Sequence, residues 1–232
     1  MPDYAAIYAQ HAQEYDALVS CEDYENHLIE LISRRVQLYD AIVVESGAGT
    51  GRLTRLLHDH IDRINAFDAS PHMLEVAIQR LANSEKQNWS FEVATHHALP
   101  VPSDSADFFI SGWSMCYAYL WPEGEAEASL LAALGEAERV VRRGGCIILL
   151  ETMGTGCTAP CPPEILAPYF ALLQRHGFEM EWFRTDYRFN SRQEAERLTD
   201  FFFGEAMRAH LDETPEGKAY LPECTGIWWK YV

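Results

Sequence analysis

A turn with three alternate glycines constrains the fold of this chain more than any other feature. The residues Glu45-Ser46-Gly47-Ala48-Gly49-Thr50-Gly51 follow a β-branched run over 42–44 and precede a segment whose apolar residues recur at helical spacing. Glycines allow positive φ and let a ligand approach the backbone without meeting a Cβ atom. The start of the following helix adds N–H donors and the positive end of its dipole. The sequence therefore predicts a strand, a turn and a helix that bind a nucleotide.

Strand-like and helix-like segments alternate from residue 41 onward. This alternation is typical of right-handed βαβ crossovers and of a parallel sheet covered on both faces. We predict an α/β fold: a Rossmann-like, doubly wound, mostly parallel seven-stranded sheet with an antiparallel edge strand and N-terminal helices. The predicted strands cover residues 42–44, 64–68, 89–94, 107–113, 146–151, 178–189 and 226–232.

Capping signals mark several of the predicted helices. Ser70 followed by Pro71 favours a helix start, and Ser191 with Glu194 has the spacing of a capping box. Gly144 and Gly145 are expected to end a helix whose last turn carries three arginines. The helices are predicted over 3–17, 24–38, 53–61, 70–81, 124–143, 164–176 and 191–207, with a loop at 154–163.

The length of 232 residues fits one α/β domain with additions. We expect a single domain over 1–232. In it, residues 1–40 would form a helical cap, 41–152 the cofactor-binding core, and 153–232 the rest of the sheet with a helical insertion.

The charge of the chain disfavours several kinds of partner. With 18 Lys+Arg against 35 Asp+Glu, the formal net charge of −17 would repel nucleic acid and anionic lipid. The N-terminus lacks a signal peptide, and no apolar run approaches the roughly 20 residues that span a bilayer. We therefore expect a cytoplasmic protein that binds a small molecule, with no nucleic acid or membrane partner. Its oligomeric state stays open.

The six cysteines are expected to be reduced thiols in that compartment, mostly acting as small hydrophobic residues. Cys157 and Cys161 have a spacing that could suit a metal. Because no second pair with zinc-like spacing accompanies them, we predict no metal site.

The glycine turn fits one class of nucleotide better than another. Dinucleotide-binding turns follow the pattern G-x-G-x-x-G, in which the third glycine lets helix and strand pack closely. Arg52 stands where that third glycine would fall. The turn therefore matches the NAD type imperfectly.

With its preceding acid, the turn resembles the first motif of the class I S-adenosylmethionine-dependent methyltransferases. Further stretches fall in that family's order: residues 68–74, 98–107, 138–145, and the strand ending at Glu151. The resemblance covers roughly residues 40–152. It implies methyl transfer from S-adenosylmethionine, with S-adenosylhomocysteine as the product, to a small-molecule acceptor.

The resemblance also implies a set of cofactor contacts. Gly47 and Gly49 would face the amino acid part of the cofactor, with Glu45 near its ammonium group. Asp68 would accept hydrogen bonds from the ribose hydroxyls, because a carboxylate can accept several. The predicted cofactor-binding residues are Glu45, Gly47, Ala48, Gly49, Asp68, Ala69, Met73, Thr95, His96 and Trp113. Thr95 and His96 stand where the family commonly places an acid for the adenine amino group, so this contact departs from its pattern.

No catalytic residue stands out from the sequence. A base is needed only if the acceptor is protonated. The candidates at the end of the sheet that carries the glycine turn are His11, His96, Tyr117 and Glu151. Tyr4, Tyr8 and Tyr15 share a helical stripe that could form a lid, or could simply cap the sheet. Two alternative functions remain: an NAD-dependent oxidoreductase on a related fold, and a nucleoside-binding protein without turnover.

Overall fold

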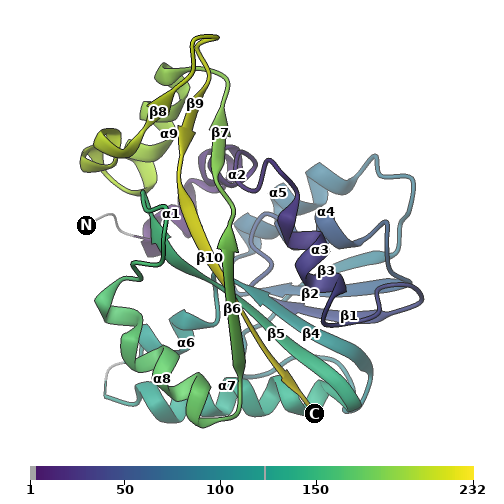
Figure 1. The fold of residues 1–232 in the computed structure, drawn as a ribbon. Helices are drawn as coiled ribbons and strands as arrows, with labels where there is room; N and C mark the ends of the chain where they lie inside the picture. Colours follow the sequence, from purple (N-terminus) through teal and green to yellow (C-terminus); the bar gives the residue numbers. More distant parts are fainter. Residues whose placement is uncertain (1–3, 123) are drawn as a thin grey trace.

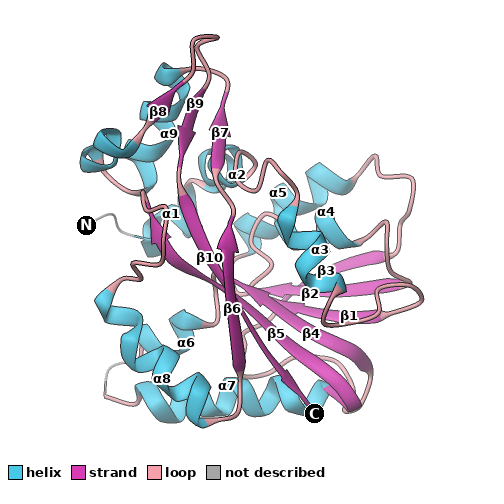
Figure 2. Cartoon of the chain, viewed as in Figure 1, coloured by secondary structure: helices cyan, strands magenta, loops and turns pink. Residues whose placement is uncertain are grey.

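A seven-stranded sheet crosses the centre of the molecule in the computed structural model, which describes residues 4–122 and 124–232 (Figures 1 and 2). The strand order is β3-β2-β1-β4-β5-β10-β6. The first five strands are parallel, and β10 is antiparallel to both of its neighbours. The strands are β1 (Ile42–Ser46), β2 (Arg63–Asp68), β3 (Trp89–Val93), β4 (Ala106–Gly112), β5 (Val141–Thr155), β6 (Glu179–Arg184) and β10 (Glu223–Tyr231). The predicted fold class, with its antiparallel strand toward one edge, is confirmed.

Helices cover both faces of this sheet, and a small second sheet of order β7-β9-β8 lies beyond one end of it (Figure 1). The helices are α1 (Tyr4–Gln10), α2 (Ala12–Val19), α3 (His27–Ser33), α4 (Arg52–Leu57), α5 (Pro71–Leu81), α6 (Cys116–Leu120), α7 (Ala126–Val140), α8 (Ala167–Arg175) and α9 (Arg192–Phe202). The described residues also form two 3₁₀ helices, η1 (Glu164–Leu166) and η2 (Glu205–His210), and the strands β7 (Tyr187–Phe189), β8 (Asp212–Glu213) and β9 (Ala219–Leu221).

Alternate residues of the central strands divide between two apolar layers, as the period of a strand requires. Val43 and Ile148 pack in one layer with α3 and α4, whereas Val44 and Leu149 pack in the other with α7 and α8. Both sets are fully buried. The central strands are therefore apolar throughout, as strands covered on both faces must be.

Two predicted helix starts are present. The Ser70 hydroxyl accepts a hydrogen bond from the backbone N–H of Met73, with Pro71 at the first helical position. The Ser191 hydroxyl accepts from the N–H of Glu194, and the Glu194 carboxylate accepts from the N–H of Asn190. Both caps satisfy N–H groups that the helix itself cannot pair.

The N-terminal helices are shorter than predicted. The predicted helix over 3–17, whose residue 3 lies outside the described part of the chain, is interrupted at His11, where φ is −128° and ψ is 36°. The predicted helix over 24–38 contracts to α3, which Asn26 precedes in the left-handed conformation.

The boundary between α7 and β5 also differs from the prediction. The helix ends at Val140, and the strand begins at once with Val141, so Arg142 lies in a strand and forms an ion pair with Asp107. A Cβ atom on Gly145 would lie 2.4 Å from the Asp107 carbonyl oxygen. Gly145 therefore permits close packing against the neighbouring strand instead of ending the helix.

The predicted strand over 178–189 divides into β6 and β7, which belong to different sheets. The Asp186 carboxylate between them binds the Arg184 guanidinium and accepts from the N–H of Glu223. The predicted helix over 191–207 ends at Phe202, and Gly204 then takes a φ of 91°. Tertiary contacts and turn residues override the longer local patterns here.

The cysteine prediction is wrong at one pair, because Cys157 and Cys161 form a disulfide. The bond closes a loop between β5 and η1, and the N–H of Cys161 donates to the Met153 carbonyl. The other four cysteines are free, and three of them are buried. The backbone of this loop brings the side chains of the two cysteines together. Their spacing in the sequence does not by itself show this contact.

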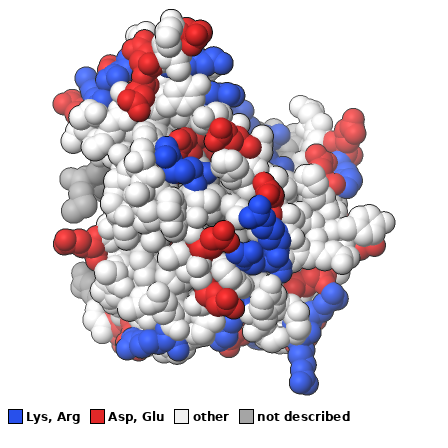
Figure 3. Space-filling view, in the orientation of Figure 1, with Lys and Arg blue, Asp and Glu red and all other residues white. Residues whose placement is uncertain are grey.

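No helix in the described ranges has the length and apolar character to cross a membrane. The face of the molecule in Figure 3 carries acidic and basic side chains interspersed with wide uncharged areas. Within residues 4–122 and 124–232, no group of three or more His, Cys, Asp or Glu residues is arranged to hold a metal ion.

Candidate functional site

A cavity of about 670 Å³ lies at the carboxyl ends of the central parallel strands. It includes residues that follow β1 and β4, two neighbouring strands at which the strand order reverses direction. Open α/β sheets bind ligands at such a switch point. Eight of the ten predicted cofactor residues line the cavity: Gly47, Gly49, Asp68, Ala69, Met73, Thr95, His96 and Trp113.

The glycine turn is held tightly before any ligand is considered. Gly47 and Ala48 both donate their N–H groups to the Phe67 carbonyl, at 2.7 and 2.9 Å, and Gly51 donates to Ala48. Gly47 has a φ of 74°, and a Cβ atom there would lie 1.9 Å from the Ser114 hydroxyl oxygen. Only glycine satisfies both demands. The turn thus offers a ligand a close backbone surface more than a set of free N–H donors.

Asp68 ends β2 and faces the cavity. One carboxylate oxygen accepts from the N–H of Gly49 and the other from the N–H of Ser70, each at 2.8 Å. Burial raises the pKa of Asp68, and these two donors oppose that effect. A carboxylate oxygen can accept more than one hydrogen bond, so both oxygens keep capacity for ligand hydroxyls.

Two predicted residues do not reach the cavity wall. Ala48 packs in a small apolar cluster with Ala66 and Leu74. Glu45 is only 1% exposed and accepts a hydrogen bond from the Thr54 hydroxyl. Burial raises the pKa of Glu45 to about 8, because removal from water penalises the charged form. Glu45 therefore lies in the core beside the turn and does not line the cavity.

His96 joins three strand ends. Its Nδ1 lies 2.7 Å from the hydroxyl of Ser46, the last residue of β1, and its Nε2 lies 3.0 Å from the hydroxyl of Ser114, which follows β4. Burial lowers the pKa of His96 to about 4, so the ring is neutral at physiological pH. Both nitrogens are occupied by serines. His96 is therefore a brace across the floor of the cavity.

Trp113 has an unusual backbone conformation for a bulky residue, with a φ of 50°. Its backbone N–H donates to the Leu150 carbonyl, and the Arg52 guanidinium carbon lies 4.0 Å from the centre of the indole ring. Arg52 in turn forms an ion pair with the buried Glu22. Strained residues of this kind cluster at functional sites. Arg52 thus supports the cavity wall from behind.

The candidate bases are distributed unevenly. His96 and Tyr117 line the cavity, but His11 and Glu151 do not. Glu151 is buried, where it accepts from the N–H of Cys116 and the hydroxyl of Tyr169, and burial raises its pKa to about 7. Burial also raises the pKa of Tyr117. His72 and His97 also line the cavity, so it holds two imidazole groups besides that of His96.

Several cavity residues were not among the predicted cofactor contacts: Ser46, Ser70, Ser114, Trp121 and the tyrosines Tyr8 and Tyr15. The tyrosine stripe and the Ser70 cap were visible in the sequence, although their place in the cavity was not. Ser114 gave no signal, because its role depends on His96 and Gly47.

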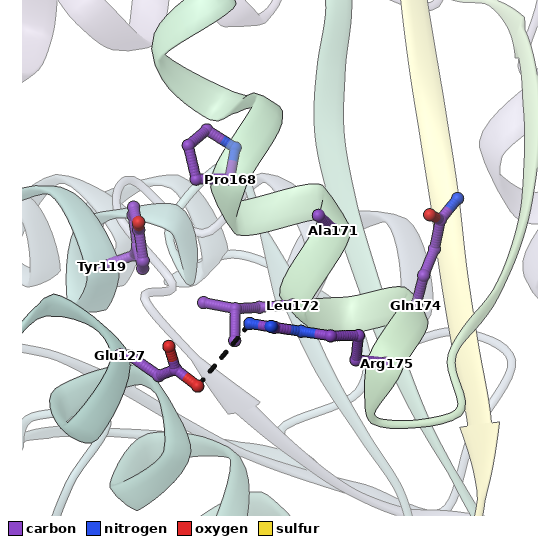
Figure 4. A pocket seen from close by; sticks show the side chains of 7 residues that line it. All are labelled: Tyr119, Glu127, Pro168, Ala171, Leu172, Gln174 and Arg175. Atoms are coloured by element: carbon purple, nitrogen blue, oxygen red, sulfur yellow. Dashed lines mark ion pairs between the residues drawn. The ribbon is translucent and has the colours of Figure 1, made fainter.

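A second hollow, of about 650 Å³, lies between α7 and α8, away from the glycine turn (Figure 4). Glu127 and Arg175 face each other across it at 3.6 Å, beside Tyr119 and Leu172. None of the predicted site residues lines this hollow. We therefore place the candidate site at the glycine turn.

The fold and this cavity are similar to those of the class I S-adenosylmethionine-dependent methyltransferases. Residues 44–149 match the family model described as a methyltransferase domain. The resemblance seen in the sequence motifs is thereby confirmed.

Individual proteins agree with this assignment. An uncharacterized methyltransferase of Exiguobacterium sibiricum is 29% identical over 154 residues, which is 63% of this chain and 65% of that protein. The malonyl-[acyl-carrier protein] O-methyltransferase of Serratia marcescens is 30% identical over 155 residues, covering 66% of this chain and 53% of that protein. The chain thus spans less than two thirds of these relatives' length.

A solved structure supports the fold across most of the chain. The YcgJ protein of Bacillus subtilis superposes with a TM-score of 0.60 at 16% identity, covering 90% of this chain and all of that one.

Proposed function

We propose that this protein transfers a methyl group from S-adenosylmethionine to a small-molecule acceptor, and that it acts as one domain with an N-terminal cap and a C-terminal insertion. One observation carries the proposal: the Asp68 carboxylate, pre-oriented by Gly49 and Ser70, meets the glycine turn at one cavity. A carboxylate there suits vicinal ribose hydroxyls, and the close backbone suits an amino acid moiety.

The residues of the cavity fit this cofactor. Asp68 would hold the ribose, while Ala69 and Met73 give an apolar surface for the adenine. Gly47 and Gly49 would lie along the amino acid part, with Glu45 buried behind them. When bound, S-adenosylmethionine supplies a methyl group on a positively charged sulfur. The protein then has mainly to align the acceptor, an orientation effect of about 7–11 kcal/mol at best.

The same geometry argues against the dinucleotide alternative. Pyrophosphate binding at a glycine turn depends on free backbone N–H groups. Here the N–H groups of Gly47, Ala48, Gly49 and Gly51 are all engaged within the protein. Arg52 also occupies the position of the third dinucleotide glycine. Methyl transfer therefore fits better than hydride transfer to NAD or from NADH.

Calorimetric titration tests the cofactor. We expect S-adenosylmethionine and S-adenosylhomocysteine to bind, and NAD and NADH not to bind. Mass spectrometry of the freshly purified protein, for a co-purified nucleoside, gives an independent check. Binding of NADH with no response to either sulfur compound would contradict the proposal. Tight cofactor binding without turnover across a broad acceptor panel would favour the non-catalytic alternative.

A further inference from the structure

The cavity has a second wall whose chemistry differs from that of the glycine turn. It consists of Tyr15, Tyr8, Tyr117 and Trp121, which we call the aromatic wall. Neighbouring rings in this order are 5.4, 5.8 and 4.4 Å apart between centroids. The wall therefore runs without a break from Tyr15, beside Gly49, to Trp121.

Trp121 is the exposed end of this wall. Its ring stacks on Tyr117 with an interplanar angle of 23°, so one indole face is covered. Trp121 is nevertheless 54% exposed, although it lines the cavity. Tyr117 and Trp121 stack, whereas the other two neighbouring pairs of the wall meet edge to face. The uncovered part of the Trp121 indole therefore gives a flat ring a surface on which to stack.

The hydroxyls of Tyr8 and Tyr117 leave one donor free. Their oxygens lie 2.8 Å apart, so one hydroxyl donates to the other. The second proton of the pair has no acceptor among the hydrogen bonds of the described residues. Burial raises the pKa of both tyrosines, so both stay protonated at neutral pH. The pair can thus donate one hydrogen bond to an oxygen in the cavity.

Charge is nearly absent from this part of the cavity. Among the described residues that line it, Asp68 is the single carboxylate, no lysine or arginine is present, and three histidines, His72, His96 and His97, are the other groups that could carry a charge near neutral pH. Asp68 already accepts from two backbone N–H groups at the other end. A phosphate or carboxylate acceptor would find no lysine or arginine there, and an amine would compete with the ribose of the proposed cofactor for Asp68, the single carboxylate. An uncharged acceptor avoids both costs.

We propose that the methyl acceptor is an uncharged, planar hydroxyarene that stacks on Trp121 and takes a hydrogen bond from the Tyr8–Tyr117 pair to its oxygen. This inference rests on the proposed methyl transfer. The arene hydroxyl loses its proton to solvent, and the tyrosine donor stabilises the resulting oxygen anion. That oxygen forms a bond to the methyl carbon as the bond from carbon to sulfur breaks. The electron pair of the broken bond stays on sulfur.

Calorimetry on the protein saturated with S-adenosylhomocysteine tests this acceptor class at pH 7. The probes are 2-naphthol, naphthalene, 2-naphthoate and 2-(aminomethyl)naphthalene, which share a ring system and differ in one group. We expect 2-naphthol to bind at least about tenfold more tightly than each of the other three. Tighter binding of the carboxylate or the amine would overturn the inference.

Variants connect the binding to the wall. Trp121→Ala is expected to weaken 2-naphthol binding at least about tenfold, whereas Trp182→Ala, at a 42% exposed tryptophan on β6, should leave it unchanged. The double variant Tyr8→Phe/Tyr117→Phe should bind 2-naphthol and naphthalene about equally. The affinity for S-adenosylhomocysteine, measured on every variant, checks that the cofactor end is intact. Unaltered 2-naphthol affinity in Trp121→Ala would refute the stacking.

The two proposals fail in different ways. If S-adenosylhomocysteine binds but 2-naphthol does not, the acceptor class is wrong and the cofactor assignment stands. If 2-naphthol binds with the predicted variant pattern but S-adenosylhomocysteine does not, the methyltransferase function is wrong and the hydroxyarene site stands.

Discussion

Glu45, the acid directly before the glycine turn, should make the stability of the protein depend on pH. Its pKa rises from 4.5 to about 8 on folding because the side chain is buried. Between these values the folded state binds more protons than the unfolded state, so this group's contribution to stability is lost as pH rises. The unfolding free energy should fall by up to about 1.4 kcal/mol per pH unit, and by at most about 5 kcal/mol over the range from pH 4.5 to about 8.

Glu45→Gln replaces the protonated acid with a neutral group whose carbonyl can still accept from Thr54. We expect the variant to match wild type near pH 4.5 and to become more stable than wild type toward pH 8. The assay is urea unfolding followed by circular dichroism at pH 5, 6, 7 and 8. Glu151 and Glu223, whose pKa values burial also raises, are present in both proteins and cancel in the difference.

The exposed Glu85 gives the matched control. Glu85→Gln should change the unfolding free energy by a similar small amount at every pH. A difference between Glu45→Gln and wild type that is also constant across pH would refute the burial argument. Addition of S-adenosylmethionine should reduce the pH dependence of wild type, since a nearby positive charge favours ionised Glu45.

Three further predictions concern the cofactor end of the cavity. Asp68→Ala should weaken S-adenosylhomocysteine binding by about 1–3 kcal/mol in calorimetry, through lost charge-assisted hydrogen bonds; unchanged affinity would exclude the ribose role. Gly47→Ala, which places a Cβ atom against Ser114, should cost about 1–3 kcal/mol more unfolding free energy than Gly177→Ala, where φ is also positive but the space is open. His96→Gln should make the protein less sensitive to acid. The pKa of His96 falls from 6.5 to about 4 on folding, so protonation of the unfolded state destabilises wild type as pH falls. Between pH 6.5 and pH 4, urea unfolding should show wild type losing up to about 3 kcal/mol of unfolding free energy relative to the variant. Equal acid sensitivity of the two proteins would contradict it.

The sequence predicts those parts of the fold that local pattern determines. The apolar run at 146–151 predicts an interior strand, and the Ser70-Pro71 pair predicts the start of α5, because each signal lies within a few residues of its effect. The division of β6 from β7 was not predictable in this way. It depends on Asp186, whose carboxylate binds the Arg184 guanidinium and accepts a hydrogen bond from the backbone N–H of Glu223, 37 residues away.

The same distinction applies to the site. Gly47, Gly49 and Asp68 belong to motifs with fixed spacing, so the sequence brings them to one cavity. The bracing of His96 between Ser46 and Ser114 joins positions 50 and 18 residues away. Hydrophobic periodicity carries no information on such contacts. The burial of the Glu45 side chain was likewise not predictable, since an acid at the end of a strand can point toward the ligand or into the core.

The strands β6 and β10 are neighbours in the large sheet, and Arg184 pairs with Cys224 where the chain leaves and re-enters it. Residues 185–222, which include the small sheet and α9, are therefore attached to the large sheet at two neighbouring positions, the end of β6 and the start of β10. A segment attached in this manner can lengthen, shorten or be exchanged without altering the order of the strands around the glycine turn. We expect sequence divergence among relatives of this chain to concentrate in this segment. A chimera that exchanges the segment should retain affinity for S-adenosylhomocysteine.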